Sequence, residues 1–226
     1  MVGPPVSFPQ TSWTLVIEAS DPSRRETALQ ELLGRYWLPL YVYLRRRGAS
    51  EQDAEELVQE LCIELVERDL IGRADPERGR LRGFLKACAD QQLMRRRERA
   101  GAWKRGGRAR LVALDTALGE RVVATSPDDA EAAMDRAWAG QVMGRALDRL
   151  VEDAGDRGEL VRTFFGAEAA PSYRDAARRF GMSVPQLKSA IHRARRRYRA
   201  LLVEEVAQTV GPGVAQDELA QLLGAL

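Results

Sequence analysis

The stretch from Ser172 to Arg199 constrains the fold more than any other part of the chain. Its first half predicts a short helix with Ser172 as N-cap and an aspartate three residues later, as in a capping box. One apolar face follows at the helical period, formed by Tyr173, Ala176, Ala177 and Phe180. Gly181 permits a turn, and Ser183 caps a second helix whose first turn tolerates Pro185. Two helices joined by a tight turn are therefore expected.

The second of these helices is strongly basic. Residues 183–199 include six Lys or Arg and no Asp or Glu. Its predicted buried stripe consists of Val184, Leu187, Ile191, Ala194 and Tyr198. A helix-turn-helix presents its second helix to the DNA major groove in this manner, whereas an ordinary helix hairpin would only expose a solvated basic face. The N-cap, the glycine turn and the unbroken basic face together favour DNA binding.

Charge is segregated along the chain, although the net charge is only +2. The stretch 51–69 holds eight acidic residues and one basic residue, whereas 81–110 holds ten basic residues and two acidic ones. Several of these acids share one side of a predicted helix, namely Asp53, Glu56, Glu60, Glu64 and Glu67. A solvated acidic face is the simple alternative, but the segregation favours separate surfaces for separate partners.

Several classes of protein are disfavoured by the bulk sequence. A hydrophobic content of 45% disfavours global disorder, and no apolar run approaches the ~18 residues of a membrane span. Cys62 and Cys88 lie in apolar helical patterns, which indicates small buried side chains in a reducing compartment rather than a disulfide or a metal site. The N-terminus lacks a signal-peptide layout, so we expect a cytoplasmic protein. With one histidine and no catalytic or phosphate-loop motif, we expect no enzyme, no cofactor and no metal.

The pattern predicts an all-α fold, because no strand-like alternation appears. Long helices are expected over 24–47, 50–68, 81–100 and 130–150, and Pro39 should kink or split the first. The predicted division is a leader with a short helix at 1–23, a helical domain at 24–100, a flexible linker at 101–130, a helix-turn-helix domain at 131–203 and a C-terminal extension at 204–226. The length of the unpatterned linker argues for two small domains.

Two motif blocks resemble bacterial RNA polymerase sigma factors of the extracytoplasmic-function group. Residues 48–60, GASEQDAEELVQE, look like the Asp-Ala-x-Asp-Leu-x-Gln-Glu signature of sigma region 2, and residues 172–199 look like the helix-turn-helix of region 4. Details at 35–41, 74–79 and 103–107 look most like the sigma-like subgroup abundant in planctomycetes. The resemblance covers about Ala28 to Leu202.

The resemblance implies a transcription initiation factor that binds core RNA polymerase and directs it to promoters. Docking on the clamp helices of the largest polymerase subunit would fall to Asp53, Glu56, Leu57, Gln59 and Glu60. Minus-ten DNA would be read by Phe84, Lys86, Asp90, Gln91, Arg95, Arg96 and Arg99. Asp90 stands where the family commonly has an asparagine, so it is expected to accept a hydrogen bond either from a base or from a neighbouring arginine.

Minus-thirty-five DNA would be read as duplex by the second helix of the opening motif. The expected contacts are Ser183, Gln186, Lys188, Ser189, His192, Arg193, Arg195, Arg196 and Arg199. The last three are placed to hold phosphates, while those near the N-terminal half reach base edges. Core polymerase and promoter DNA are thus the expected partners, an anti-sigma factor is a further candidate, and no membrane is involved.

Three alternatives remain open from the sequence. In the basic stretch 103–110, either Trp103 caps the core of the first domain or the bases from Lys104 to Arg110 enter a polymerase channel near the template strand. The chain could instead be a stand-alone helix-turn-helix regulator whose N-terminal helices dimerise or bind a partner. A helical adaptor or inhibitor of polymerase is the third hypothesis. The acidic helix at 50–68 favours the sigma factor over the stand-alone regulator, because a regulator has no need for it.

Overall fold

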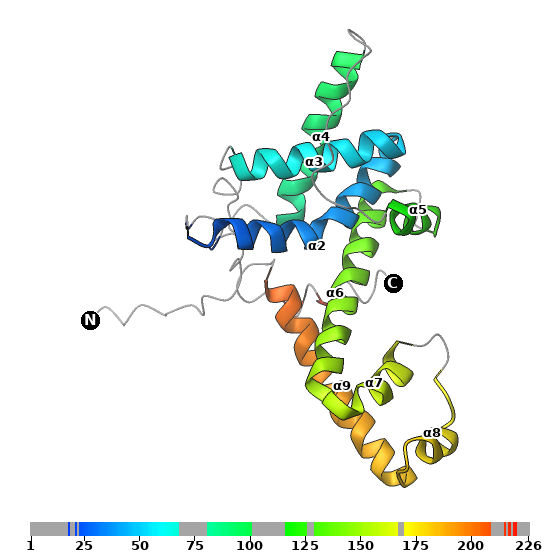
Figure 1. The fold of residues 1–226 in the computed structure, drawn as a ribbon. Helices are drawn as coiled ribbons and strands as arrows, with labels where there is room; N and C mark the ends of the chain where they lie inside the picture. Colours follow the sequence, from blue (N-terminus) through cyan, green and yellow to red (C-terminus); the bar gives the residue numbers. More distant parts are fainter. Residues whose placement is uncertain are drawn as a thin grey trace, which may run out of the picture. The chain divides into compact units, whose positions relative to one another are not determined.

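The computed structural model describes residues 23–67, 81–100, 116–125, 129–166 and 170–208, together with positions 18, 21, 215, 217, 219 and 220. Every regular element in these ranges is a helix, which confirms the all-α prediction (Figure 1). The elements are α2 (Arg25–Arg46), α3 (Glu51–Glu67), α4 (Leu81–Ala100), α5 (Thr116–Thr125), α6 (Ala130–Ala154), the 3-10 turn η3 (Gly155–Arg157), α7 (Gly158–Phe165), α8 (Tyr173–Arg179) and α9 (Val184–Ala207).

The chain divides into two compact units. Unit 1 comprises Met1–Ala139 and Ala207–Leu226, and unit 2 comprises Gly140–Val206. The boundary therefore falls within α6, after the position 130/131 that the sequence suggested. The basic stretch 104–110 and Trp103 lie outside the described residues, so their two alternatives stay as stated.

Unit 1 is built around α2, which packs against α3, α4 and α5. The second half of α2 is apolar almost all round, and Leu40, Tyr41 and Leu44 are no more than 1% exposed. Such burial explains why α2 continues through Pro39 as one helix: the favourable burial of its neighbours outweighs the lost backbone hydrogen bond. The first half of α6 also belongs to this unit, where the Arg82 guanidinium lies 4.1 Å from the ring centroid of the buried Trp138.

Helix α5 lies inside the stretch 101–130 that the sequence assigned to a flexible linker. The structure places it against α2 in unit 1. Glu120 accepts hydrogen bonds from the Tyr41 hydroxyl at 2.6 Å and from Arg45 Nε and Nη2 at 2.6 and 2.9 Å. The contact needs a glycine at 119, because a Cβ there would lie 2.7 Å from a Tyr41 ring carbon. Residues 116–125 are thus part of the first unit rather than linker.

Unit 2 is a small bundle formed by the second half of α6, α7, α8 and α9. Its core holds Leu160 of α7, Ala176 and Ala177 of α8, and Leu187 and Ile191 of α9. Helix α9, drawn in orange, runs alongside α6, and the Tyr198 hydroxyl donates to the Met143 carbonyl at 3.1 Å (Figure 1). The tight turn between α8 and α9 occurs where the sequence predicted it.

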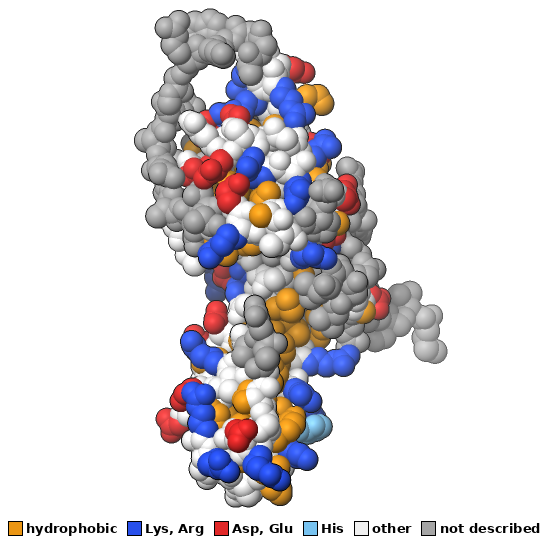
Figure 2. Space-filling view, turned by 90° about the vertical axis from the view of Figure 1, so that its right-hand side faces the viewer, with side chains coloured by type: hydrophobic (Ala, Val, Ile, Leu, Met, Phe, Trp, Pro, Cys, Tyr) orange, Lys and Arg blue, Asp and Glu red, His pale blue; other side chains and the backbone are white. Residues whose placement is uncertain are grey.

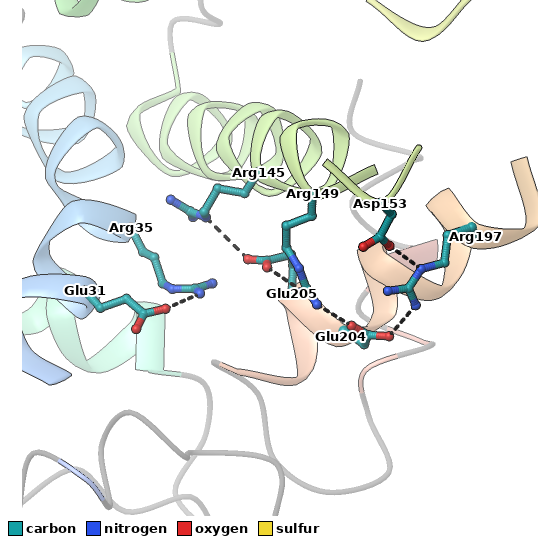
Figure 3. A network of polar contacts seen from close by, with 8 residues as sticks. All are labelled: Glu31, Arg35, Arg145, Arg149, Asp153, Arg197, Glu204 and Glu205. Atoms are coloured by element: carbon teal, nitrogen blue, oxygen red, sulfur yellow. Dashed lines mark hydrogen bonds and ion pairs between the residues drawn. The ribbon is translucent and has the colours of Figure 1, made fainter. Parts of the chain in front are cut away.

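A polar network fastens the C-terminal part of α9 to α6 (Figure 3). Arg149 bonds Glu204 at 2.8 Å and the buried Glu205 at 3.1 Å, and Arg197 bonds Asp153 at 2.7 Å. A buried carboxylate is costly unless it is paired, and two arginines of α6 approach Glu205. These contacts hold the C-terminal half of α9 on α6, while Leu187 and Ile191 hold its N-terminal half in the core of unit 2.

Candidate functional site

The acidic side of α3 surrounds one arginine of α4. Arg96 Nε lies 2.9 Å from Asp53 Oδ1, Arg96 Nη2 bonds Glu56, and Arg96 Nη1 lies 3.9 Å from Glu60. The hydrogen bond from Arg96 lowers the pKa of Glu56, against the desolvation that would raise it. Four residues that the sequence assigned to two different partners therefore contact one another. We call Asp53, Glu56, Glu60 and Arg96 the Arg96 cluster.

Two other residues assigned to the polymerase surface differ in their access to a partner. Leu57 is 0% exposed and belongs to the core of unit 1, so its assignment to an intermolecular contact is corrected. Its position on the apolar side of α3, rather than its place in the motif, determines its role. Gln59 is half-buried and stays accessible. Asp53 also accepts a 2.7 Å hydrogen bond from the Ser50 hydroxyl, which caps α3 through the Asp53 amide.

Several polar side chains of α4 are engaged within unit 1. Lys86 bonds Glu131 at 2.5 Å. Asp90 accepts from the Tyr43 hydroxyl at 2.8 Å and from Arg47 Nε at 3.1 Å, which is the neighbouring-arginine alternative expected for it. Phe84 is half-buried on the same helix. In this state these side chains hold the unit together rather than extend toward a ligand.

A second group on α4 remains available. Gln91 and Arg99 are exposed and Arg95 is half-exposed, and none of the three bonds another residue in the described ranges. They recur every four residues and so follow one stripe of the helix. Of the minus-ten candidates, these three present the most accessible polar groups.

The turn between α8 and α9 is defined by two helix caps and one glycine. Ser172 Oγ accepts from the Asp175 amide at 3.2 Å, and Gly181 has a φ of +61°. Ser183 and Gln186 form a reciprocal capping box: the Ser183 amide donates to Gln186 Oε1 at 2.8 Å, and the Gln186 amide donates to Ser183 Oγ at 3.3 Å. Their side-chain oxygens are thus already used at the N-terminus of α9, and Gln186 retains its amide N–H donors for a ligand.

The other minus-thirty-five candidates are exposed on α9, and Figure 2 shows the pale-blue histidine among blue Lys and Arg side chains. They are Lys188, Ser189, His192, Arg193, Arg195, Arg196 and Arg199. Lys188 Nζ lies 5.7 Å from the ring centroid of Tyr173. The four arginines bond no residue in the described part of the chain, whereas Arg197 between them is paired with Asp153. The surface therefore carries uncompensated positive charge on the side of α9 opposite its core.

Comparison with known families decides the identity of the first unit. Residues 32–102 match the family model of Sigma-70 region 2. The chain contains a Sigma-70 region 2 domain. The match begins within α2 and includes α3 and α4, and it covers less than half of the 226 residues. No curated protein and no solved structure matches the chain.

The region 2 domain gives the α3 and α4 surfaces a functional context. Region 2 implies binding to core RNA polymerase and indicates a sigma factor, a class of protein that is not enzymatic.

The described residues include no group of His, Cys, Asp or Glu suited to a metal ion, and none of the described helices has the length and apolarity of a membrane span. Burial raises the pKa of the Cys62 thiol to about 12, so this thiol stays protonated and unreactive.

One exposed side chain of the region 2 domain was missed in the sequence. Met94 of α4 is 59% exposed. It lies one helical turn from Gln91 and next to Arg95, on the solvent side of the helix. The sequence could have indicated this exposure, because Met94 lies outside the apolar face of the helix and is followed by three arginines.

Proposed function

We propose that the chain is a sigma factor that binds core RNA polymerase and directs it to promoters. The observation that carries the proposal is the region 2 match at 32–102, which includes both the acidic side of α3 and the basic α4. The order of this domain and a basic helix pair after it supports the extracytoplasmic-function group, with details of the planctomycete-type subgroup. A cytoplasmic location follows from this role.

The polymerase contact is assigned to the accessible acids and amide of α3. Glu56, Gln59 and Glu60 meet basic residues on the clamp helices of the largest subunit, and complementary charge steers that encounter and fixes its register. Glu56 and Glu60 also belong to the Arg96 cluster, so the partner's cations compete with Arg96 for the same carboxylates. Polymerase binding thereby alters the environment of α4.

Minus-ten recognition is assigned to the accessible stripe of α4. Gln91 supplies hydrogen-bond donors and an acceptor to base edges, while Arg95 and Arg99 hold phosphates of the opened strand. Met94 adds an apolar surface beside them on which a base can stack. Arg96 joins this surface when its carboxylate partners are taken by polymerase.

Minus-thirty-five recognition is assigned to α9, with α8 as its supporting helix in a helix-turn-helix. Ser189 and His192 reach base edges in the major groove, and Arg193, Arg195, Arg196 and Arg199 hold phosphates. The exposed side of α9 supports this assignment, because its arginines have no internal anions among the described residues. An anti-sigma factor would act by covering one of these surfaces.

Transcription by core RNA polymerase with and without the chain tests the proposal. A library of genomic fragments serves as template, and transcript 5′ ends are mapped. Fixed start sites that require the chain and share sequence elements at minus ten and minus thirty-five are expected. Binding of the chain to discrete DNA sites without any chain-dependent transcript would instead identify a stand-alone regulator. Polymerase binding that only lowers transcription would identify an inhibitor.

A further inference from the structure

A groove in unit 2 borders the exposed side of α9. Its volume is about 470 Å³, within the range of small-molecule sites. One side is formed by η3, and the other by the turn and the first three turns of α9. The lining residues are Arg157, Gly181, Met182, Pro185, Gln186, Ser189 and Arg193.

The groove is positively charged. Its lining holds two arginines and no carboxylate. Arg157 and Arg193 also line an adjoining groove of about 300 Å³, together with Arg197 and Asp153, which are paired with each other. Neither the Arg157 nor the Arg193 guanidinium bonds another residue in the parts of the chain that the structure describes. Both guanidiniums therefore attract an anion that enters the groove.

Two other arginines of unit 2 form ion pairs with carboxylates of the same unit. Arg197 lies 2.7 Å from Asp153, and Arg179 lies 2.5 Å from Glu159. Those two side chains are therefore used in holding helices together. Arg157 of η3 makes no such ion pair. It lines the same groove as Gln186, Ser189 and Arg193, three candidate DNA contacts.

We propose that this groove holds the sugar–phosphate backbone of duplex DNA, with Arg157 and Arg193 on either side of one phosphate. The proposal rests on the proposed function, and it adds a contact from outside α9 that the sequence analysis did not find. Guanidinium groups bind phosphate oxygens in bidentate geometry, which suits this arrangement. Met182 and Pro185 offer an apolar surface to deoxyribose.

The position of Arg157 gives it a distinct role in recognition. DNA contacts from side chains of α9 alone leave unit 2 free to rotate about the α9 axis in the major groove. A phosphate held from η3 fixes that rotation, because η3 lies across the groove from α9. Arg157 is thus a positioning residue: it sets the orientation in which Ser189 and Arg193 meet the DNA.

Salt dependence of DNA binding tests the groove. The full chain is titrated with a fluorescent duplex at several salt concentrations, and the slope of log K against log salt is measured. Losing one phosphate contact lowers the magnitude of the slope by about 0.9. Because the two guanidiniums share one phosphate, we expect this change for the double variant Arg157→Ala with Arg193→Ala and a smaller decrease for each single variant. We expect Arg157→Lys to retain most of the slope. Arg121→Ala, which removes an exposed arginine of α5, is the matched charge control and should leave the slope unchanged.

The outcomes separate the groove from the proposed function. A lower slope for Arg193→Ala together with an unchanged slope for Arg157→Ala would overturn the groove and leave DNA reading by α9 in place. Unchanged slopes for both variants would also overturn the groove, and α9 would remain the DNA-binding helix if Arg196→Ala with Arg199→Ala lowered the slope. Arg157-dependent binding of a labelled poly-glutamate, with duplex binding independent of Arg157, would show that the groove takes an acidic peptide and would also overturn the proposal.

Discussion

A single residue sets the backbone conformation of the turn between α8 and α9. Gly181 occupies the left-handed region at φ +61°, and a Cβ added there meets no atom within 4 Å. The cost of Gly181→Ala is therefore conformational, about 1 kcal/mol of unfolding free energy. Gly144→Ala is the matched control: Gly144 lies within α6 with no atom near its Cβ position, so it should stabilise by up to about 1 kcal/mol. Urea denaturation followed by circular dichroism measures both changes, and equal signs would contradict this account.

Another residue-scale effect concerns the Arg96 cluster. Glu56→Gln weakens the hold on Arg96 and frees it for nucleic acid, whereas Glu51→Gln removes the same charge from α3 without a contact to Arg96. A partly exposed ion pair contributes about 0.5 kcal/mol, so we expect single-stranded DNA to bind roughly twofold tighter to Glu56→Gln than to Glu51→Gln. Fluorescence anisotropy at fixed salt measures the difference. It should vanish in an Arg96→Ala background; equal affinities of the two variants in the otherwise unchanged chain would show that Arg96 does not reach DNA.

At the scale of elements, the docking of α5 depends on one carboxylate. The hydrogen bonds from Arg45 lower the pKa of Glu120 to about 2 from its ordinary 4.5. Because the folded pKa is the lower one, the stabilisation is fully present above pH 4.5 and is lost as pH falls toward 2. The melting temperature of the wild type should therefore exceed that of Glu120→Gln at neutral pH, and the difference should shrink between pH 4.5 and 2. A difference that is constant over this range would contradict the role of the ionised carboxylate.

The elements also show what the sequence can and cannot predict. Helices α3, α4 and α8 were predicted close to their observed bounds, since their caps and apolar stripes are local signals. Helix α9 begins as predicted but continues to Ala207, past the boundary after residue 203 that the sequence suggested. Helix α5 was assigned to a linker, because its docking depends on Tyr41 and Arg45, which lie more than seventy positions earlier. The unbroken passage of α2 through Pro39 likewise depends on tertiary burial. Motif position placed Leu57 in the polymerase contact, and only the packing of α3 shows it to be core.

At the scale of the molecule, internal pairing distinguishes structural charges from functional ones. The sequence offered long lists of basic residues for DNA. Of those candidates, Lys86 and Arg96 are paired with carboxylates within the described residues, whereas Arg95, Arg99 and the four exposed candidate arginines of α9 are not. An arginine without an internal anion is the one for which an external phosphate adds net stabilisation. Which basic side chain meets a carboxylate depends on the fold. The sequence could therefore locate the basic surfaces, but it could not show which of their residues are free to bind DNA.

The polymerase surface on α3 and the duplex-binding surface on α9 should respond to different substitutions. Glu60→Lys reverses a charge on α3 that lies 3.9 Å from Arg96, a weaker contact than those of Asp53 or Glu56, so it should weaken binding to core polymerase with little effect on the fold. Arg196→Ala with Arg199→Ala should lower the magnitude of the duplex-binding salt slope by about 1.8, at about 0.9 for each lost phosphate contact, and leave polymerase affinity unchanged. Co-sedimentation with core polymerase and anisotropy with duplex DNA measure the two affinities of each full-length variant. If Glu60→Lys impaired duplex binding, or the arginine pair impaired polymerase binding, the assignment of one partner to each surface would be wrong.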